Sequence, residues 1–150
     1  MMRLTAAATA IALSALAWSG AYAADHEVRM VNKDSEGRAM QFEPAFLKVG
    51  PGDTINFVVG DKSHNSESAS VPEGGETWKG KINQEVSVTV QTEGLYAYKC
   101  LPHLGMGMVG LIQVGDSTAN LDAVEAIKLP PKAKSRMAEL VAEATGSATN

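Results

Sequence analysis

The sequence predicts an all-β fold, an antiparallel β-sandwich, with two α-helices at its C-terminal end. Up to residue 116, short segments of alternating or β-branched residues are separated by turns rich in Gly, Pro, Asn and Asp. After residue 116 the apolar residues recur at helical spacing. The chain has 150 residues, which is enough for one domain with a hydrophobic core of its own.

Residues 1–23 are predicted to be a cleaved secretory signal peptide. Arg3 supplies a positive start, residues 4–18 are apolar apart from Thr and Ser, and residues 21–23 form an A-x-A cleavage signal. The apolar run is too short for a membrane anchor. We therefore expect a soluble exported protein whose mature chain, 24–150, is a single domain, with the sandwich over 24–116 and a helical extension over 117–150.

Six extended segments are expected, because each alternates apolar and polar residues or is rich in β-branched and aromatic side chains: 26–32, 40–49, 54–59, 85–91, 95–99 and 109–114. Pro44 confines the second segment to a sheet edge or a bend. Residues 60–75 are expected to form a long polar loop, and Thr77-Trp78 a further short strand. Long loops in small domains often carry function.

Two helices are expected after the last strand. Ser117-Thr118 can cap the first, over 119–128, and Pro130-Pro131 interrupts the helical pattern. In the second, over 132–144, apolar residues follow i, i+3, i+4, i+7 spacing at Met137, Leu140, Val141 and Ala144. We expect this helical part to cover one face or edge of the sandwich.

The net charge of the chain bears on whether nucleic acid is a partner. The formal net charge is −4, and it becomes −5 when Arg3 is removed with the signal peptide. This balance gives no indication of nucleic acid as a partner.

Cys100 is the only cysteine in the chain. Cysteines in oxidising compartments usually pair, so a single one in an exported protein requires an explanation. Cys100 could be a buried inert thiol, an intermolecular disulfide, a nucleophile or a metal ligand. Its neighbours decide between these.

The segment from Cys100 to Met108 brings a thiolate, an imidazole and a thioether within nine residues. His103 lies between them, and His64 is a second histidine in the polar loop. One thiolate, two imidazoles and a weak axial thioether form the ligand set of a mononuclear blue-copper electron-transfer site. A loop fixed at both ends by strands holds its ligands with little freedom, which suits electron transfer. Met106 is an alternative axial ligand.

Other chemistry fits these residues less well. A structural zinc site needs four strong ligands, usually with several cysteines. A cysteine nucleophile needs a base and a third orienting group, and it leaves Met108 unexplained. Attachment of c-type haem needs C-x-x-C-H, which is absent. Taken alone, each residue is more often structural, but the combination after a strand in an exported protein favours metal ligation.

The segment 98–116 resembles the C-terminal copper loop of the cupredoxins, the type 1 blue copper proteins. The pattern Lys-Cys-x-Pro-His-x-x-Met-Gly-Met at 99–108 is close to the loop of one cupredoxin subfamily. The similarity covers nearly the whole predicted mature chain, and includes 42–45, 51–54, 61–68, 72–74, 79–83 and the two helices. The stretch between His64 and Pro72 is shorter than in the usual form of that subfamily.

The resemblance implies a cupredoxin-like Greek-key sandwich that binds one type 1 copper ion, cycling between Cu(I) and Cu(II), through His64, Cys100, His103 and Met108. It implies that Asn65 ties the two ligand loops together. It also implies a non-enzymatic carrier of single electrons in the periplasm, with a copper nitrite reductase of denitrification as the expected partner. A periplasmic copper carrier or chaperone is the alternative, although the chain lacks the Met-rich or His-rich runs common in such proteins.

Redox partners are expected to dock around His103. The apolar patch expected around its imidazole consists of Leu101, Pro102, Leu104, Gly105 and Met106. Near the ligands in sequence lie four lysines, Lys62, Lys79, Lys81 and Lys99. In an acidic protein these lysines would steer an acidic partner to the metal. The alternative is ordinary surface charge, and the family resemblance favours steering.

The third histidine, His26, has two interpretations. It is either a surface residue at the end of a strand or part of a second copper site. After cleavage behind Ala23, the terminal Ala24-Asp25-His26 would offer an amine, two amides and an imidazole to a square-planar Cu(II).

Overall fold

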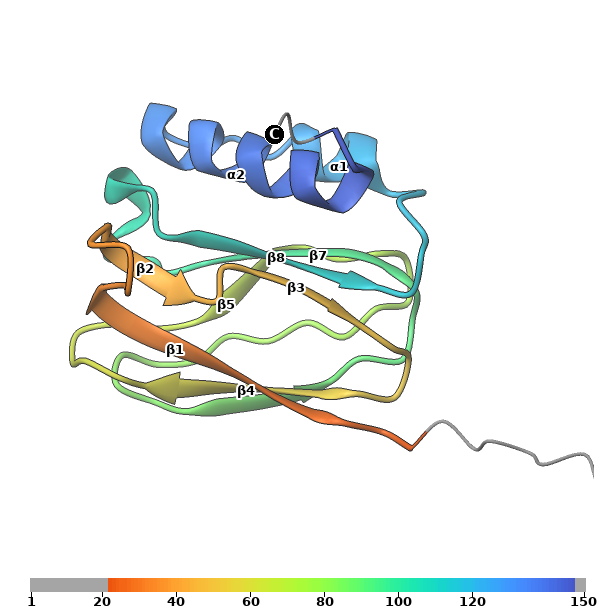
Figure 1. The fold of residues 1–150 in the computed structure, drawn as a ribbon, viewed down its shortest axis with the longest axis horizontal. Coiled ribbons are helices and arrows are strands. Elements are labelled where there is room, and N and C mark those ends of the chain that lie inside the picture. Colours follow the sequence, from red (N-terminus) through yellow and green to blue (C-terminus); the bar gives the residue numbers. More distant parts are fainter. Residues whose placement is uncertain (1–21, 148–150) are drawn as a thin grey trace, which may run out of the picture.

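The computed structural model describes residues 22–147, so most of the predicted signal peptide lies outside the described residues. Within this range eight strands form two four-stranded sheets, arranged as the two layers of a sandwich (Figure 1). The strands are β1 (Asp25–Lys33), β2 (Ala39–Glu43), β3 (Phe46–Val49), β4 (Thr54–Val59), β5 (Glu67–Ser70), β6 (Val86–Thr89), β7 (Gly94–Lys99) and β8 (Val109–Val114).

One sheet has the strand order β2-β1-β4-β6, and the other has the order β3-β8-β7-β5. Most neighbouring strands are antiparallel, but β1 runs parallel to β4 and β3 runs parallel to β8. The predicted sandwich followed by two helices is confirmed, with one parallel pair in each sheet. The predicted segment 40–49 bends at Pro44, which separates β2 in one sheet from β3 in the other.

Aromatic rings fill the space between the sheets. Phe42 and Phe57 both pack edge-on against Tyr98, at ring-centroid distances of 4.8 and 5.0 Å. Trp78 stacks on Phe57 at 5.4 Å. Such pairs add about 0.5–1.5 kcal/mol each beyond the area they bury. Because Tyr98 lies two residues before Cys100, this cluster supports the strand that leads into the cysteine.

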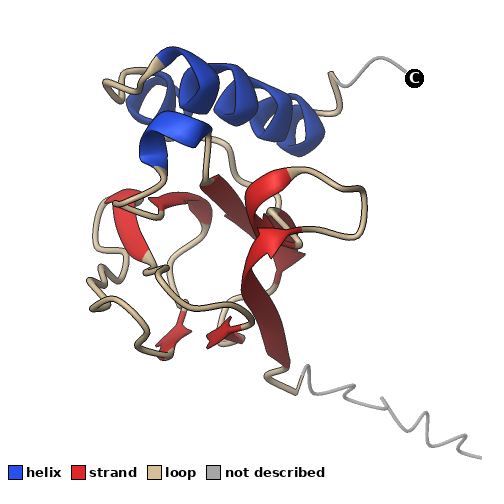
Figure 2. Ribbon diagram, turned by 90° about the vertical axis from the view of Figure 1, so that its left-hand side faces the viewer, coloured by secondary structure: helices blue, strands red, loops and turns tan. Residues whose placement is uncertain are grey.

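The two helices, α1 (Leu121–Glu125) and α2 (Pro131–Thr145), lie across the outer face of the β3-β8-β7-β5 sheet, as the labels in Figure 1 show. Figure 2 shows both helices on one side of the strands. Met137 and Leu140 of α2 pack with Leu95, Ala97 and Leu111 of the sheet. The predicted cover is therefore confirmed. Because both faces of this sheet are covered at β7 and β8, these two strands are mostly apolar and do not alternate between apolar and polar residues. No helix in the described part of the chain has the length and apolar run needed to cross a bilayer.

Two predictions in the loop 60–75 and just after it were wrong. The loop contains a strand, β5, whose sequence Glu-Ser-Ala-Ser lacks the residues that favour strands. Backbone pairing with β7 forms it instead. Thr77-Trp78 is not a strand, because only the next residue, Lys79, makes an isolated bridge, to Glu67.

The first helix is shorter than predicted and begins after Asn120 rather than after Ser117-Thr118. The Asn120 side chain does not cap the helix. Its Oδ1 accepts from the Leu95 N–H at 2.9 Å, and its Nδ2 donates to the Leu95 carbonyl at 2.8 Å. The asparagine thus ties the chain after β8 to the start of β7.

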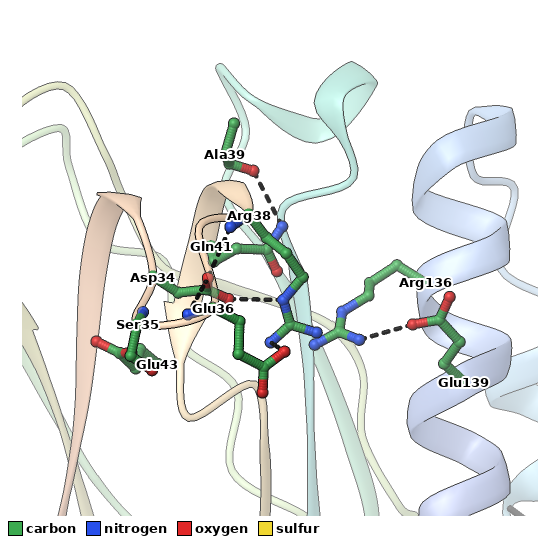
Figure 3. A network of polar contacts seen from close by, with 9 residues as sticks. All are labelled: Asp34, Ser35, Glu36, Arg38, Ala39, Gln41, Glu43, Arg136 and Glu139. Atoms are coloured by element: carbon green, nitrogen blue, oxygen red, sulfur yellow. Dashed lines mark hydrogen bonds and ion pairs between the residues drawn. The ribbon is translucent and has the colours of Figure 1, made fainter.

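A polar network closes the turn between β1 and β2 (Figure 3). Asp34 accepts from the backbone N–H groups of Glu36 and Arg38, and the Arg38 Nε donates to Asp34 at 2.7 Å. Arg136 of α2 donates to Glu139 at 2.7 Å. Arg38 and Arg136 both line a cavity of about 270 Å³, so this turn and α2 meet at one corner of the sandwich.

Replacing Gly110 by Ala should destabilise the fold by about 1–3 kcal/mol, the usual cost of overpacking a core. Gly110 lies opposite Tyr98 in the β7–β8 register, and a Cβ at Gly110 would overlap the Tyr98 ring. Urea unfolding measures the loss. Gly105→Ala is the control, because a Cβ there meets no atom within 4 Å. Equal stability of the two variants would contradict this prediction.

Candidate metal centre

Two loops bring the predicted ligands together. His64 lies in the loop after β4, and Cys100 and Met108 flank the loop between β7 and β8. The β7–β8 ladder continues to the end of that loop, because the Cys100 N–H donates to the Met108 carbonyl at 3.0 Å. The backbone ladder thus fixes both ends of the segment that also carries His103.

Three residues, His64, Cys100 and His103, each place one possible ligand atom in the same small region. These atoms all lie within 4.8 Å of one another. The Cys100 Sγ lies 3.8 Å from the His64 Nδ1 and 3.6 Å from the His103 Nδ1. The two Nδ1 atoms are 3.1 Å apart. Metal bonds of about 2.3 Å to sulfur and about 2.0 Å to nitrogen, at trigonal angles, separate S from N by about 3.7 Å. The two edges of the donor triangle that join sulfur to nitrogen therefore have the length that one metal ion requires.

Met108 is fully buried, and its N–H donates to the His103 carbonyl at 3.3 Å. Between them, Leu104–Met106 forms one 3-10 turn, which sequence reasoning treated as plain loop. Gly107 ends this turn with a φ of 91°. A Cβ at Gly107 would lie 3.4 Å from the Lys132 carbonyl oxygen, so the start of α2 packs directly against the ligand loop. The helical extension therefore also supports the site.

His64 is oriented by a residue that sequence reasoning did not single out. Its Nε2 lies 3.0 Å from the Asn32 Oδ1, which leaves Nδ1 facing Cys100 and His103. Burial, and then the proximity of His103, lowers the pKa of His64. The imidazole is therefore neutral and able to bind a metal at neutral pH. Asn32 lies near the end of β1 with no motif around it, so only the tertiary contact reveals its role.

The Cys100 thiol is completely buried. Burial raises its pKa, backbone hydrogen bonds from Asn65 and His103 oppose that rise, and the charge of Glu67 adds to it. A metal cation has the opposite effect on a coordinating thiol, because it binds the thiolate. In this environment Cys100 is a poor free nucleophile but a suitable ligand.

Asn65 connects the two ligand loops, as predicted. Its Oδ1 accepts from the Leu101 N–H at 2.7 Å, next to Cys100. Its Nδ2 donates to the Gly80 carbonyl at 3.1 Å and to the Glu67 Oε2 at 3.2 Å. Asn65 is 3% exposed, so these bonds are shielded from water. The loop that carries His64 is thereby held in register with the loop that carries Cys100.

The surface around the donor triangle is apolar and rich in lysine. Leu101 and Met106 are 54% and 46% exposed. His103, which lies between them in the sequence, is half-buried. Ile82, at 49%, is a further exposed apolar residue, which sequence reasoning did not select. Of the four predicted lysines, Lys62, Lys79 and Lys81 are exposed. The fourth, Lys99, is half-buried and lies 3.5 Å from Glu67.

His26 has a structural partner. Its Nε2 lies 2.8 Å from the Asp53 Oδ2, and the Ala24 N–H donates to the other carboxylate oxygen at 2.9 Å. Both ends of the Ala24-Asp25-His26 segment are thus held by one carboxylate at the start of β1. Binding of a second Cu(II) by this segment would have to break these contacts.

Comparison with known proteins agrees with this geometry. Residues 28–115 match the family of copper-binding proteins of the plastocyanin/azurin type. The chain belongs to this family of copper proteins.

The chain is 56% identical to a pseudoazurin of Paracoccus pantotrophus over 139 residues, which covers 91% of this chain and 94% of that protein. A solved pseudoazurin from Sinorhizobium meliloti is 49% identical, with a TM-score of 0.79 over 84% of this chain and 99% of that one. Another from Hyphomicrobium denitrificans is 47% identical, with a TM-score of 0.74 over 79% and 97%. Within the family the chain is therefore a member of the pseudoazurins, which are blue copper electron carriers.

Replacing Asp53 by Asn should lower stability at neutral pH but not in strong acid. Hydrogen bonds from Ala24 and then His26 lower the pKa of Asp53 below its ordinary value of 3.8. Asp53 therefore stabilises the fold fully above that ordinary pKa, and the effect is lost as the pH falls through the lowered folded-state value. Chemical unfolding of both proteins across pH 2–7 measures this. A stability difference independent of pH would refute it.

Proposed function

We propose that this protein binds one type 1 copper ion through His64, Cys100, His103 and Met108 and shuttles single electrons between redox proteins in the periplasm. The observation that carries the proposal is the triangle of two imidazole nitrogens and one thiol sulfur, within 4.8 Å of one another. The buried Met108 is held next to it, because its carbonyl accepts from the Cys100 N–H. When bound, the copper ion supplies the one-electron couple. The residues of the chain set its surroundings.

Rigidity is the contribution of the protein to the electron-transfer step. The two loops are joined by Asn65, and the β7–β8 ladder and α2 hold the ligand loop from both sides. If the geometry of the site hardly differs between the two oxidation states, little structural reorganisation is needed when an electron enters or leaves. His64 and Cys100 are fully buried, so water does not reach them. These features favour a shuttle over a copper carrier, which must release its metal readily.

His103 is the proposed route for the electron. It is the only half-buried member of the donor triangle, and the exposed Leu101 and Met106 lie close to it in the same loop. An apolar patch around a partly exposed ligand allows a partner to approach and exclude water. Small, weak interfaces of this kind are typical of redox encounters.

Charge is proposed to orient the partner. The chain is acidic overall, with a net charge of −4, yet Lys62, Lys79 and Lys81 are all exposed and near the ligand loops in sequence or contact. Such an arrangement steers an acidic partner toward the metal. A copper nitrite reductase of denitrification is the partner that the pseudoazurin relationship favours.

Export is part of the proposal. The Ala24 N–H is held by Asp53 at the start of β1, so a mature chain that begins at Ala24 would keep this contact. Cleavage behind Ala23 would place the protein in the periplasm.

The oxidised, copper-loaded protein should show an intense visible absorption band that Cys100→Ala abolishes. The band requires a thiolate bonded to Cu(II). Met106→Leu is the control, because its exposed side chain is not a proposed ligand. Absorption and spin-resonance spectra of the three proteins measure this. A band that survives in Cys100→Ala would exclude Cys100 as a ligand.

Replacing Lys62 and Lys81 by Glu should slow electron transfer to a copper nitrite reductase about tenfold or more at low salt. The difference should shrink toward 1 M salt, where the Debye length is about 3 Å. Stopped-flow kinetics measures the rates. The control is Lys48→Glu, which also makes the net charge more negative but alters a surface lysine that pairs with Asp116. Equal rates in both variants at all salt concentrations would argue against steering.

A further inference from the structure

Glu67 is a buried carboxylate beside the metal centre with no role in the proposed ligand set. It is the first residue of β5 and is 8% exposed. In the sheet it pairs with Lys99 of β7, and on its other side it bridges to Lys79. One acidic residue therefore sits between two of the lysines predicted to steer a partner.

Its side chain links one of these lysines to the ligand loops. The Glu67 Oε1 lies 3.5 Å from the Lys99 Nζ. The Glu67 Oε2 accepts from Asn65 Nδ2 at 3.2 Å, and Asn65 Oδ1 accepts from the Leu101 N–H at 2.7 Å. The chain of contacts thus runs from a lysine on the surface to the amide that follows Cys100.

The charge on this carboxylate is needed for the ion pair with Lys99 but not for the hydrogen bond from Asn65. A neutral glutamine has the same shape and could accept the same hydrogen bond from Asn65. Taking a carboxylate out of water is costly, so a buried ion pair is weak evidence for stability. In a partly dry environment, however, a fixed charge acts on neighbouring charges far more strongly than in water.

We propose that Glu67 is a positioning residue whose hydrogen bond orients Asn65 and whose charge, balanced by Lys99, sets the reduction potential of the copper. A negative charge near the metal favours Cu(II) and lowers the potential, whereas the Lys99 ammonium favours Cu(I) and raises it. The inference rests on the proposed copper ligands.

The carboxylate of the pair lies at the surface where a partner is proposed to dock. Glu67 lines a surface hollow of about 430 Å³, together with Lys79, Lys81, Ile82 and Leu101. An acidic group of a partner that binds the exposed Lys79 or Lys81 would therefore lie close to Glu67.

The test compares Glu67→Gln, Lys99→Gln and the double variant with the wild type, each loaded with copper. Redox titration against a mediator measures the equilibrium constant for reduction. Glu67→Gln should raise this constant roughly two- to tenfold, Lys99→Gln should lower it by a similar factor, and the double variant should return close to the wild-type value. Asp116→Asn and Lys48→Gln are the charge-matched controls from another surface ion pair, and should leave it unchanged.

The positioning role has its own readout in the copper-free protein. Glu67→Ala should increase hydrogen exchange at the Leu101 N–H about tenfold, because Asn65 loses the partner that orients it. Glu67→Gln should retain the wild-type protection. Equal protection in all three proteins would overturn the positioning role.

The blue absorption band of the wild type distinguishes failure of the proposed copper ligand set from failure of the inference about Glu67. If the wild type binds copper without that band, the proposed ligand set is wrong and this inference falls with it. If the band is present and identical in all variants but the potential does not move, the inference alone is wrong. If Glu67→Gln does not fold, Lys99→Gln decides, and an unchanged potential in that variant overturns the inference.

Discussion

The antiparallel pairing of β7 with β8 is the constraint on which the rest of the structure depends. The pairing continues past the strands to the bond between the Cys100 N–H and the Met108 carbonyl, so the ladder itself closes the ligand loop. Everything around the pair keeps it in place. Aromatic rings fill the inner face, the helices cover the outer face, and Gly110 leaves room for the Tyr98 ring. The site is therefore rigid because the core is.

Burial and a bound metal cation act in opposite directions on the Cys100 thiol. Burial raises the pKa of Cys100 and lowers the pKa of His64, so without a metal both side chains favour their neutral forms. Binding a cation costs the proton of the thiol but not of the imidazole. The surface shows the complementary arrangement, with exposed apolar side chains beside the half-buried His103 and lysines close to the ligand loops. The two buried ligands are thus shielded from water, while the half-buried His103 at the same end of the molecule is accessible to a partner.

Much of this could be predicted from sequence, for identifiable reasons. The spacing of Cys100, His103 and Met108 is local, and the strands that flank them are strongly apolar. The errors came where the chain has no local signal. β5 consists of Glu67, two serines and an alanine, and only pairing with β7 makes it a strand. The first helix was predicted to begin after Ser117-Thr118, yet it begins after Asn120, whose side chain binds Leu95.

By itself the sequence determined the class of fold, the candidate ligands and the relationship to the cupredoxins, because periodicity and ligand spacing are properties of neighbouring residues. Only the tertiary structure decided which distant groups complete the site. Asn32 reaches His64 from β1, Lys132 packs against Gly107 from α2, and Glu67 connects Asn65 with Lys99. These contacts depend on how the sheets and helices pack, and no pattern along the chain encodes them separately.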